Sequence, residues 1–291
     1  MPTVAERMGR RGFVSFELWP PRTPESASAL EDALARLAPL EPAFVAITYG
    51  AGGSTRERTH DLVVRLVGSP LLPLAHLTCA AHHRSELVEL MERYRRAGVD
   101  NLLALHGDPP LSATEELPEG DLRHAVELVA LARELGFPCV GVAVHPEGHP
   151  AATSRAADLA HQAAKLREAD FALTQFFHRA DDYFALVDEL RRRGATAPVV
   201  PGVMPITSVR QVERMAAMSG SSIPLALARR LQAVAHDPEA VRRVGVEHAT
   251  ELCRRLLDGG APGLHFYTMN RAAATLEVCA NLGFEATASR Y

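Results

Sequence analysis

Short apolar runs alternate with longer amphipathic segments along the whole chain, and this alternation constrains the fold more than any other feature. The runs are rich in Val, Ile, Leu and Phe, as buried parallel strands are, and the segments between them have helical period. Eight runs are predicted strands: Phe13–Trp19, Phe44–Gly50, Leu72–Cys79, Asn101–Asp108, Cys139–His145, Phe171–Phe177, Pro198–Met204 and Gly263–Thr268. Repeated βα units of this kind favour a parallel sheet covered by helices.

Helical segments follow the predicted strands, and glycines mark the ends of several. Three examples are Ser85–Ala97, Asp121–Leu135 and Asp181–Arg193. The interval between the seventh and eighth strands is unusually long. We expect extra helices there, namely one after Thr207, one around Ile223–Ala235 and one in Pro238–Leu257.

The number of units predicts an α/β fold of the (βα)8 TIM-barrel type, as a single domain over residues 1–291 with extra helices between strands 7 and 8. The length of 291 residues suits this fold, which commonly takes about 250 residues. No linker rich in Pro, Gly or Ser divides the chain. A doubly wound open sheet is the alternative, but its G-x-G-x-x-G fingerprint does not follow the first strand.

Composition excludes several classes of function. The chain is 47% hydrophobic and 23% charged, with a net charge of -4 and interspersed acids and bases, so neither a nucleic-acid partner nor a membrane surface is expected. No signal peptide or long apolar segment is evident, and we expect a cytoplasmic protein. The four cysteines lie far apart, which favours reduced thiols over a zinc knuckle. The composition does not decide the oligomeric state, and a homo-oligomer is one alternative.

Polar residues at the carboxyl ends of barrel strands are the candidates for function, because active sites of this fold lie there. Those expected at strand ends are Glu17, Thr48, Tyr49, His76, Thr78, His106, Asp108, His145, Glu147, His149, Gln175, His265, Tyr267 and Asn270.

Glu17 is the first catalytic candidate. It is flanked by Phe16 and Leu18, and burial should raise its pKa toward the range of roughly 6–7 that suits a general acid. The alternative is a structural salt bridge to a lysine or arginine. From spacing alone, a purely structural or binding role for the chain also competes.

The segment His145-Pro146-Glu147-Gly148-His149 contains three residues of metal-ligand type. Pro146 and Gly148 prevent the helix that would place two histidines one turn apart, so we expect no metal site.

Eight motifs, in order from about residue 13 to residue 284, resemble those of the methylenetetrahydrofolate reductase family. They are Phe16–Thr23, Thr48–Thr55, His76–Cys79, Ala104–Pro110, His145–Pro150, Thr174–Phe177, Pro201–Ile206 and His265–Arg271. The resemblance implies an oxidoreductase that reduces 5,10-methylenetetrahydrofolate to 5-methyltetrahydrofolate with a nicotinamide hydride.

The resemblance also implies roles for single residues. Glu17 would protonate N10 of the folate and open its five-membered ring to an iminium cation, which Asp108 would stabilise. Asp108, Gln175, Tyr267 and Arg271 would contact the folate. The residues expected around the cofactor or cosubstrate are Thr48, His76, His106, His145, His149, Lys165 and Gln175.

Most members of the family carry FAD, and this chain matches their flavin contacts only in part. The same residue is kept at His76, His149, Asp158 and Lys165. Departures from the family pattern are His106 for an arginine, His145 for an aromatic residue, Pro118-Glu119 for a Tyr-Ala pair, His161 for an asparagine and Ala164 for an arginine.

These departures remove permanent cations from the place of a pyrophosphate and add a carboxylate. The resemblance therefore implies a flavin-independent reductase of the actinobacterial type, with NADH or NADPH as cosubstrate and FAD absent. Three alternatives remain: an FAD-dependent reductase with divergent contacts, a related barrel acting on another pterin or methyl carrier, and a non-catalytic folate-binding or regulatory homologue.

Overall fold

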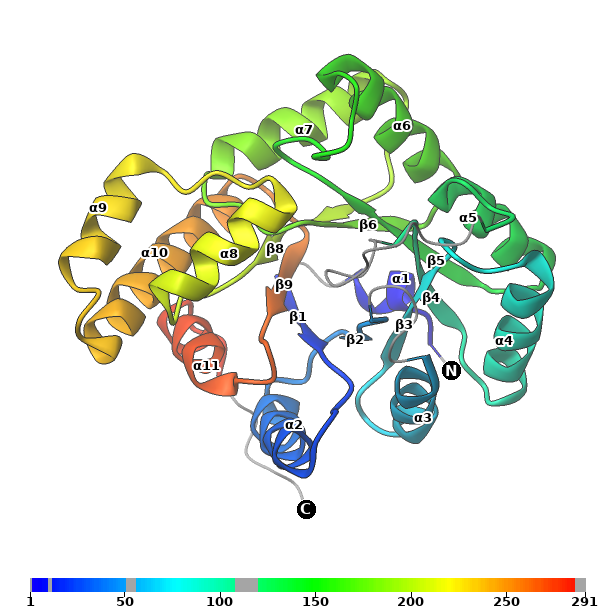
Figure 1. The fold of residues 1–291 in the computed structure, drawn as a ribbon, viewed down its shortest axis with the longest axis horizontal. Helices are drawn as coiled ribbons and strands as arrows, with labels where there is room; N and C mark the ends of the chain where they lie inside the picture. Colours follow the sequence, from blue (N-terminus) through cyan, green and yellow to red (C-terminus); the bar gives the residue numbers. More distant parts are fainter. Residues whose placement is uncertain (1, 10–11, 51–55, 108–119, 286–291) are drawn as a thin grey trace.

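Parallel strands form the centre of the protein, and helices surround them (Figure 1). The computed structural model describes residues 2–9, 12–50, 56–107 and 120–285. The strands are β1 (Phe13–Leu18), β2 (Val45–Ile47), β3 (Pro73–Thr78), β4 (Asn101–Leu105), β5 (Cys139–Val144), β6 (Phe171–Thr174), β7 (Val199–Val200), β8 (Gly202–Val203) and β9 (Gly263–Tyr267).

Every strand pairs with its neighbours in parallel, in the order β7-β6-β5-β4-β3-β2-β1-β9-β8. Since β7 and β8 are consecutive parts of one segment, the sheet closes on itself. The predicted α/β barrel is therefore confirmed.

The predicted seventh strand, Pro198–Met204, is interrupted and forms the two short strands β7 and β8. Pro201 lies between them and has no N–H group to donate to a ladder. Its carbonyl still accepts a hydrogen bond from the His265 N–H at 3.0 Å, and the Gly202 N–H donates to Thr174 Oγ1 at 2.8 Å. These contacts join the two edges of the barrel at the break.

The helices are α1 (Val4–Arg7), α2 (Pro24–Leu37), α3 (Arg56–Leu66), α4 (Arg84–Arg96), α5 (Ala125–Glu134), α6 (Arg155–Glu168), α7 (Ala180–Arg192), α8 (Val209–Ser219), α9 (Leu225–Ala233), α10 (Pro238–Asp258) and α11 (Ala272–Asn281). The predicted helix Asp121–Leu135 begins later, at Ala125. The reason is that Glu127 Oε2 accepts the N–H groups of Arg123 and His124 and so caps the helix there. Within the described ranges, no helix has the length and apolar character needed to cross a membrane.

Two sets of side chains fill the barrel and its surroundings. One set lies inside the barrel and includes Phe13, Phe44 and Phe171, and the other lies between strands and helices and includes Phe16 and Leu18. The alternation follows from the two-residue period of a strand. On β1, Phe13 and Glu17 therefore share the inward face.

The long interval between β8 and β9 holds α8, α9 and α10, as predicted, and Figure 1 shows them gathered on one side of the barrel. They have a small core of their own, formed with Phe176, Met204 and Ile206. At Gly245, α10 approaches the backbone closely, since a Cβ atom there would lie 1.9 Å from the Ile206 carbonyl oxygen. This approach fixes α10 against the segment that leaves β8.

We predict that Gly245→Ala lowers the free energy of unfolding by about 1–3 kcal/mol, because the added methyl group forces the helix and the Ile206 backbone apart. Chemical denaturation measures this change. Glu251→Ala on the exposed face of the same helix is the control and should change stability far less. Equal stability of Gly245→Ala and the wild type would contradict the close approach.

Candidate active site

The Glu17 carboxyl lies at the carboxyl end of β1 inside the barrel. Its side chain is 12% exposed, and burial raises its pKa to about 7, which a hydrogen bond from the Trp19 indole N–H, 3.4 Å from Oε1, partly opposes. Near neutral pH a large fraction of Glu17 is therefore protonated. A buried group in this state is suited to donate a proton.

Histidine and tyrosine side chains lie next to this carboxyl. His76 Nε2 is 3.9 Å from Glu17 Oε2, but burial lowers the pKa of His76 to about 3, so the imidazole is neutral and forms no ion pair. Tyr267 donates its hydroxyl to the Thr174 carbonyl at 2.6 Å, and burial and then the charge of Glu17 raise its pKa. No lysine or arginine of the described ranges pairs with Glu17, which disfavours the salt-bridge alternative.

A cavity of about 180 Å³ opens between the ends of β8 and β9 and the helices that follow them. Tyr267 and Arg271, both predicted folate contacts, line it together with Gln211 and Arg242. Arg271 is exposed and is the N-cap residue of α11. The structure thus brings two predicted binding residues to one cavity. Glu17 is not among the described residues that line it, but Thr268, which does line it, donates its hydroxyl to the Glu17 carbonyl at 2.7 Å.

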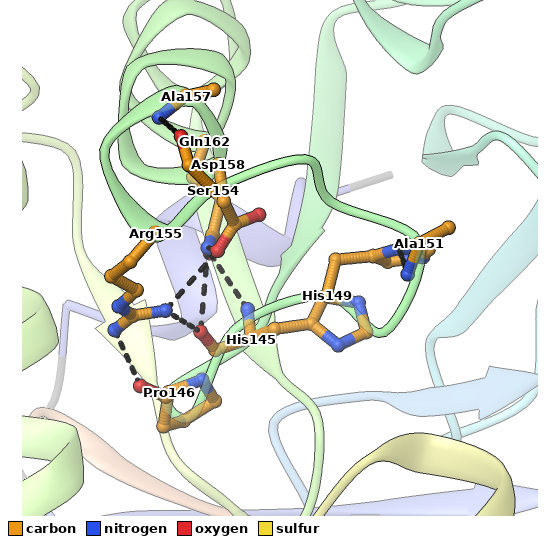
Figure 2. Close-up of polar contacts among 9 residues, drawn as sticks. All are labelled: His145, Pro146, His149, Ala151, Ser154, Arg155, Ala157, Asp158 and Gln162. Carbon is orange, nitrogen blue, oxygen red and sulfur yellow. Dashed lines mark hydrogen bonds and ion pairs between the residues drawn. The ribbon is translucent and has the colours of Figure 1, made fainter.

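A second polar group joins the end of β5 to α6 (Figure 2). Gln162 accepts the His145 N–H at 2.7 Å and donates to Asp158 Oδ2 at 2.7 Å. Arg155 donates to the same Asp158 oxygen at 3.1 Å and to the Pro146 carbonyl at 2.6 Å. The charges of Arg155 and Asp158 are therefore compensated by each other, by Gln162 and by a carbonyl of the preceding loop.

The remaining predicted residues of this region lie around that network. The rings of His145 and His149 meet edge to face with centroids 4.8 Å apart, and His149 is exposed. Burial lowers the pKa of His145 to about 3 and that of the partly buried Lys165 to about 8. Near neutral pH the imidazole of His145 is therefore uncharged.

Three predicted contacts lie at other strand ends. Gln175 lines a small cavity with His145 and accepts the Phe176 N–H at 2.9 Å. The Thr48 carbonyl accepts the Thr59 hydroxyl, and His106 is exposed at the end of β4. Asp108 and Glu119 lie outside the described residues.

Sequence reasoning missed three side chains that organise the site: Trp19, Arg155 and Gln162. The i, i+2 spacing of Trp19 from Glu17 was an available signal, because such residues share one face of an extended chain. Arg155 and Gln162 gave no comparable signal, since surface arginines and glutamines are common on helices.

No group of three or more His, Cys, Asp or Glu side chains suited to hold a metal ion occurs in the part of the chain that the structure describes.

A (βα)8 barrel with a buried, protonated carboxyl at the carboxyl end of a strand is the architecture of an enzyme. Residues 4–283 match the family model described as methylenetetrahydrofolate reductase. The chain belongs to the methylenetetrahydrofolate reductase family, and the expected enzyme class is thereby confirmed.

Single relatives agree with this assignment. The chain is 34% identical to 5,10-methylenetetrahydrofolate reductase of Pectobacterium carotovorum, over 99% of this chain and 95% of that protein. It is 33% identical to methylenetetrahydrofolate reductase (NADH) 1 of Arabidopsis thaliana, over 94% of this chain and 49% of that protein.

A solved structure shows the same fold. It is a Clostridium thermocellum protein described as binding two copies of 5-methyl-5,6,7,8-tetrahydrofolic acid. It superposes with a TM-score of 0.64 at 15% identity, over 96% of this chain and 95% of that one.

We predict that Glu17→Gln stabilises the protein more at pH 8 than at pH 5. The pKa of Glu17 is about 7 in the fold against 4.5 for the free side chain, so the stability gained by keeping it protonated is present below 4.5 and is lost as pH rises through 7. Between pH 5 and pH 8 the difference in unfolding free energy between the variant and the wild type should change by about 2–3 kcal/mol.

Urea denaturation of both proteins at the two pH values measures this difference. Glu92→Gln, on the exposed face of α4, removes a surface carboxyl and is the matched control. A difference between Glu17→Gln and wild type that does not change with pH would show that the carboxyl is not buried as described.

Proposed function

We propose that the chain reduces 5,10-methylenetetrahydrofolate to 5-methyltetrahydrofolate with a hydride taken directly from NADH or NADPH, without bound flavin. The observation that carries this proposal is the buried carboxyl of Glu17, whose pKa of about 7 suits proton donation to a weakly basic nitrogen. The family to which the chain belongs supplies the reaction.

Glu17 donates its proton to N10 of the folate, the C–N10 bond breaks, and the one-carbon unit becomes an iminium cation on N5. The resulting Glu17 carboxylate, together with Asp108, stabilises that cation electrostatically. The nicotinamide supplies the hydride that turns the iminium carbon into a methyl group. Substrate, NAD(P)H and one proton thus give methyltetrahydrofolate and NAD(P)+.

Binding residues hold the two reactants together. Tyr267 and Arg271 contact the folate from the cavity that they line, and Gln175 donates or accepts a hydrogen bond at the pterin or the nicotinamide. Thr48 faces the nicotinamide. Direct transfer requires the reacting carbons to be held at near-attack distance, which is the contribution of these contacts.

The residues at the place of a flavin fit that group poorly. Cations favour the binding of a pyrophosphate. Of the three basic residues of α6, Arg155 donates to Asp158 and to a loop carbonyl, and Arg167 donates to the Arg193 carbonyl. Lys165 remains, with a pKa that burial lowers to about 8. His161 and Ala164 add no permanent charge. This poor fit supports direct hydride transfer from the nicotinamide.

We predict that the purified protein is colourless, that it oxidises NADH or NADPH only with methylenetetrahydrofolate present, and that it does not reduce menadione-like dyes. A reduced flavin passes electrons to such dyes, whereas a ternary complex leaves no reduced intermediate. Initial-rate plots should therefore intersect. The visible spectrum tests for a flavin, and double-reciprocal plots of initial rates test for a ternary complex.

Release on denaturation of a stoichiometric yellow cofactor that absorbs at about 450 nm would support the FAD-dependent alternative. Parallel double-reciprocal plots would do the same. Folate binding without any reductase activity would instead support the non-catalytic alternative. Activity confined to a different pterin or methyl carrier would support a related barrel enzyme.

We predict that Glu17→Gln lowers kcat by roughly 10² to 10⁴-fold, because it keeps the size of the side chain but removes the transferable proton. The dissociation constant for methyltetrahydrofolate should change little. Measuring both, with the melting temperature, separates a chemical defect from a structural one. Near wild-type turnover in a variant that remains folded would show that Glu17 is not the acid.

A further inference from the structure

Trp19 is the only tryptophan of the chain, and its indole N–H is the hydrogen-bond donor to the carboxyl of Glu17, with Nε1 3.4 Å from Oε1. The residue is 40% exposed, far more than most large apolar residues of this protein. An exposed indole directed at a buried acid is not explained by core packing.

The backbone of Trp19 is held in place by the turn that follows β9. Its N–H donates to Asn270 Oδ1 at 2.8 Å, and its carbonyl accepts from Asn270 Nδ2 at 2.9 Å. One residue pair thus forms a double hydrogen bond between the carboxyl ends of the neighbouring strands β1 and β9. Thr268 adds a third contact, because its hydroxyl donates to the Glu17 carbonyl at 2.7 Å.

This turn is strained. Met269 and Asn270 both have left-handed backbone angles, with φ of 53° and 55°. Such angles are unfavourable for non-glycine residues and persist where the surrounding structure imposes them, often at functional sites. Glu41 and Ala81 have similar angles elsewhere, but only in this turn do two such residues follow each other within the described chain, and the second is the Asn270 that holds Trp19.

The other described groups that face Glu17 form no hydrogen bond with its Oε1. His76, on β3, is neutral and lies 3.9 Å from the other oxygen, Oε2. On β9, Tyr267 donates its hydroxyl to Thr174, and His265 interacts with the Ser15 hydroxyl at 2.9 Å and has a pKa lowered by burial to about 3. None of these described groups competes for Oε1.

We propose that Trp19 is a positioning residue for Glu17: its indole N–H keeps Oε1 as an acceptor, so that Oε2 carries the transferable proton. A hydrogen bond to one carboxyl oxygen disfavours protonation of that oxygen and fixes the plane of the group. The same bond stabilises the carboxylate once the proton has left. The part of this inference that concerns catalysis rests on the proposed function.

The sole tryptophan makes the contact directly measurable without substrate. Its fluorescence should change with pH through a single step centred near the pKa of Glu17, about 7, because a carboxylic acid and a carboxylate differ in how they quench an indole. Glu17→Gln should abolish this step, and Glu92→Gln should retain it. Emission that is constant across the neutral range, or a step that survives in Glu17→Gln, would overturn the proposal.

Kinetics test the positioning role. Trp19→Phe keeps an aromatic ring but removes the donor, so kcat should fall by about 3- to 10-fold while KM for the folate changes less than about two-fold. The alkaline limb of the rate profile should move to higher pH, because loss of a hydrogen bond to the carboxylate raises the pKa of Glu17. Unchanged kcat and an unmoved alkaline limb would overturn the role.

Asn270→Gly tests the hydrogen bonds that hold the Trp19 backbone separately from the indole N–H itself. Glycine relieves the left-handed strain, so this variant should fold, but it removes both hydrogen bonds to the Trp19 backbone. We expect a fall in kcat in the same direction as in Trp19→Phe, with a weaker fluorescence step. Wild-type kcat and an undiminished step would show that Trp19 is placed without Asn270.

Failure of this inference is distinguishable from failure of the proposed function. A chain without reductase activity whose emission titrates with Glu17 would overturn the proposed function and leave the Trp19–Glu17 contact in place. An active reductase with constant emission would overturn the contact alone.

Discussion

The burial of one carboxyl group, that of Glu17, is the constraint on which the site depends. Glu17 shares the inward face of β1 with Phe13 and Ser15, and closure of the barrel withdraws all of them from water. His76, 3.9 Å away, is itself kept neutral by burial, and no cation of the described residues pairs with the carboxylate. The barrel therefore holds a proton near neutral pH, because burial outweighs the one hydrogen bond that Trp19 donates to the charge.

The opposite arrangement exists at the end of β5. There the charge of Asp158 is compensated at short range by Arg155 and Gln162, and both side chains also hold loop carbonyls. These hydrogen bonds anchor the loop after β5 without a ligand. A cation that binds a phosphate would instead have hydrogen-bond donors left over for it. The mouth of the barrel thus has one part with an acid that no described cation pairs with and another in which Arg155 and Asp158 compensate each other.

Much of the fold was predictable because apolar runs report burial directly. The strands end earlier than expected, since residues such as Thr48 and Gln175 belong to the loops that carry the site and not to the ladder. Glu17 was predictable because its neighbours Phe16 and Leu18 require a buried strand. Arg155 was not predictable, because its role depends on carbonyl groups that only the folded loop brings to it.

The turn after β9 shows how strain and function are linked in this site. Glycine would adopt the left-handed angles of Met269 and Asn270 at lower cost, but glycine at 270 could not form the two hydrogen bonds to Trp19. Asparagine tolerates this conformation better than most residues and carries both a donor and an acceptor on its side chain. The left-handed turn thus adds a side-chain link to the parallel ladder of β1 and β9, at the carboxyl ends of both strands and two residues from Glu17.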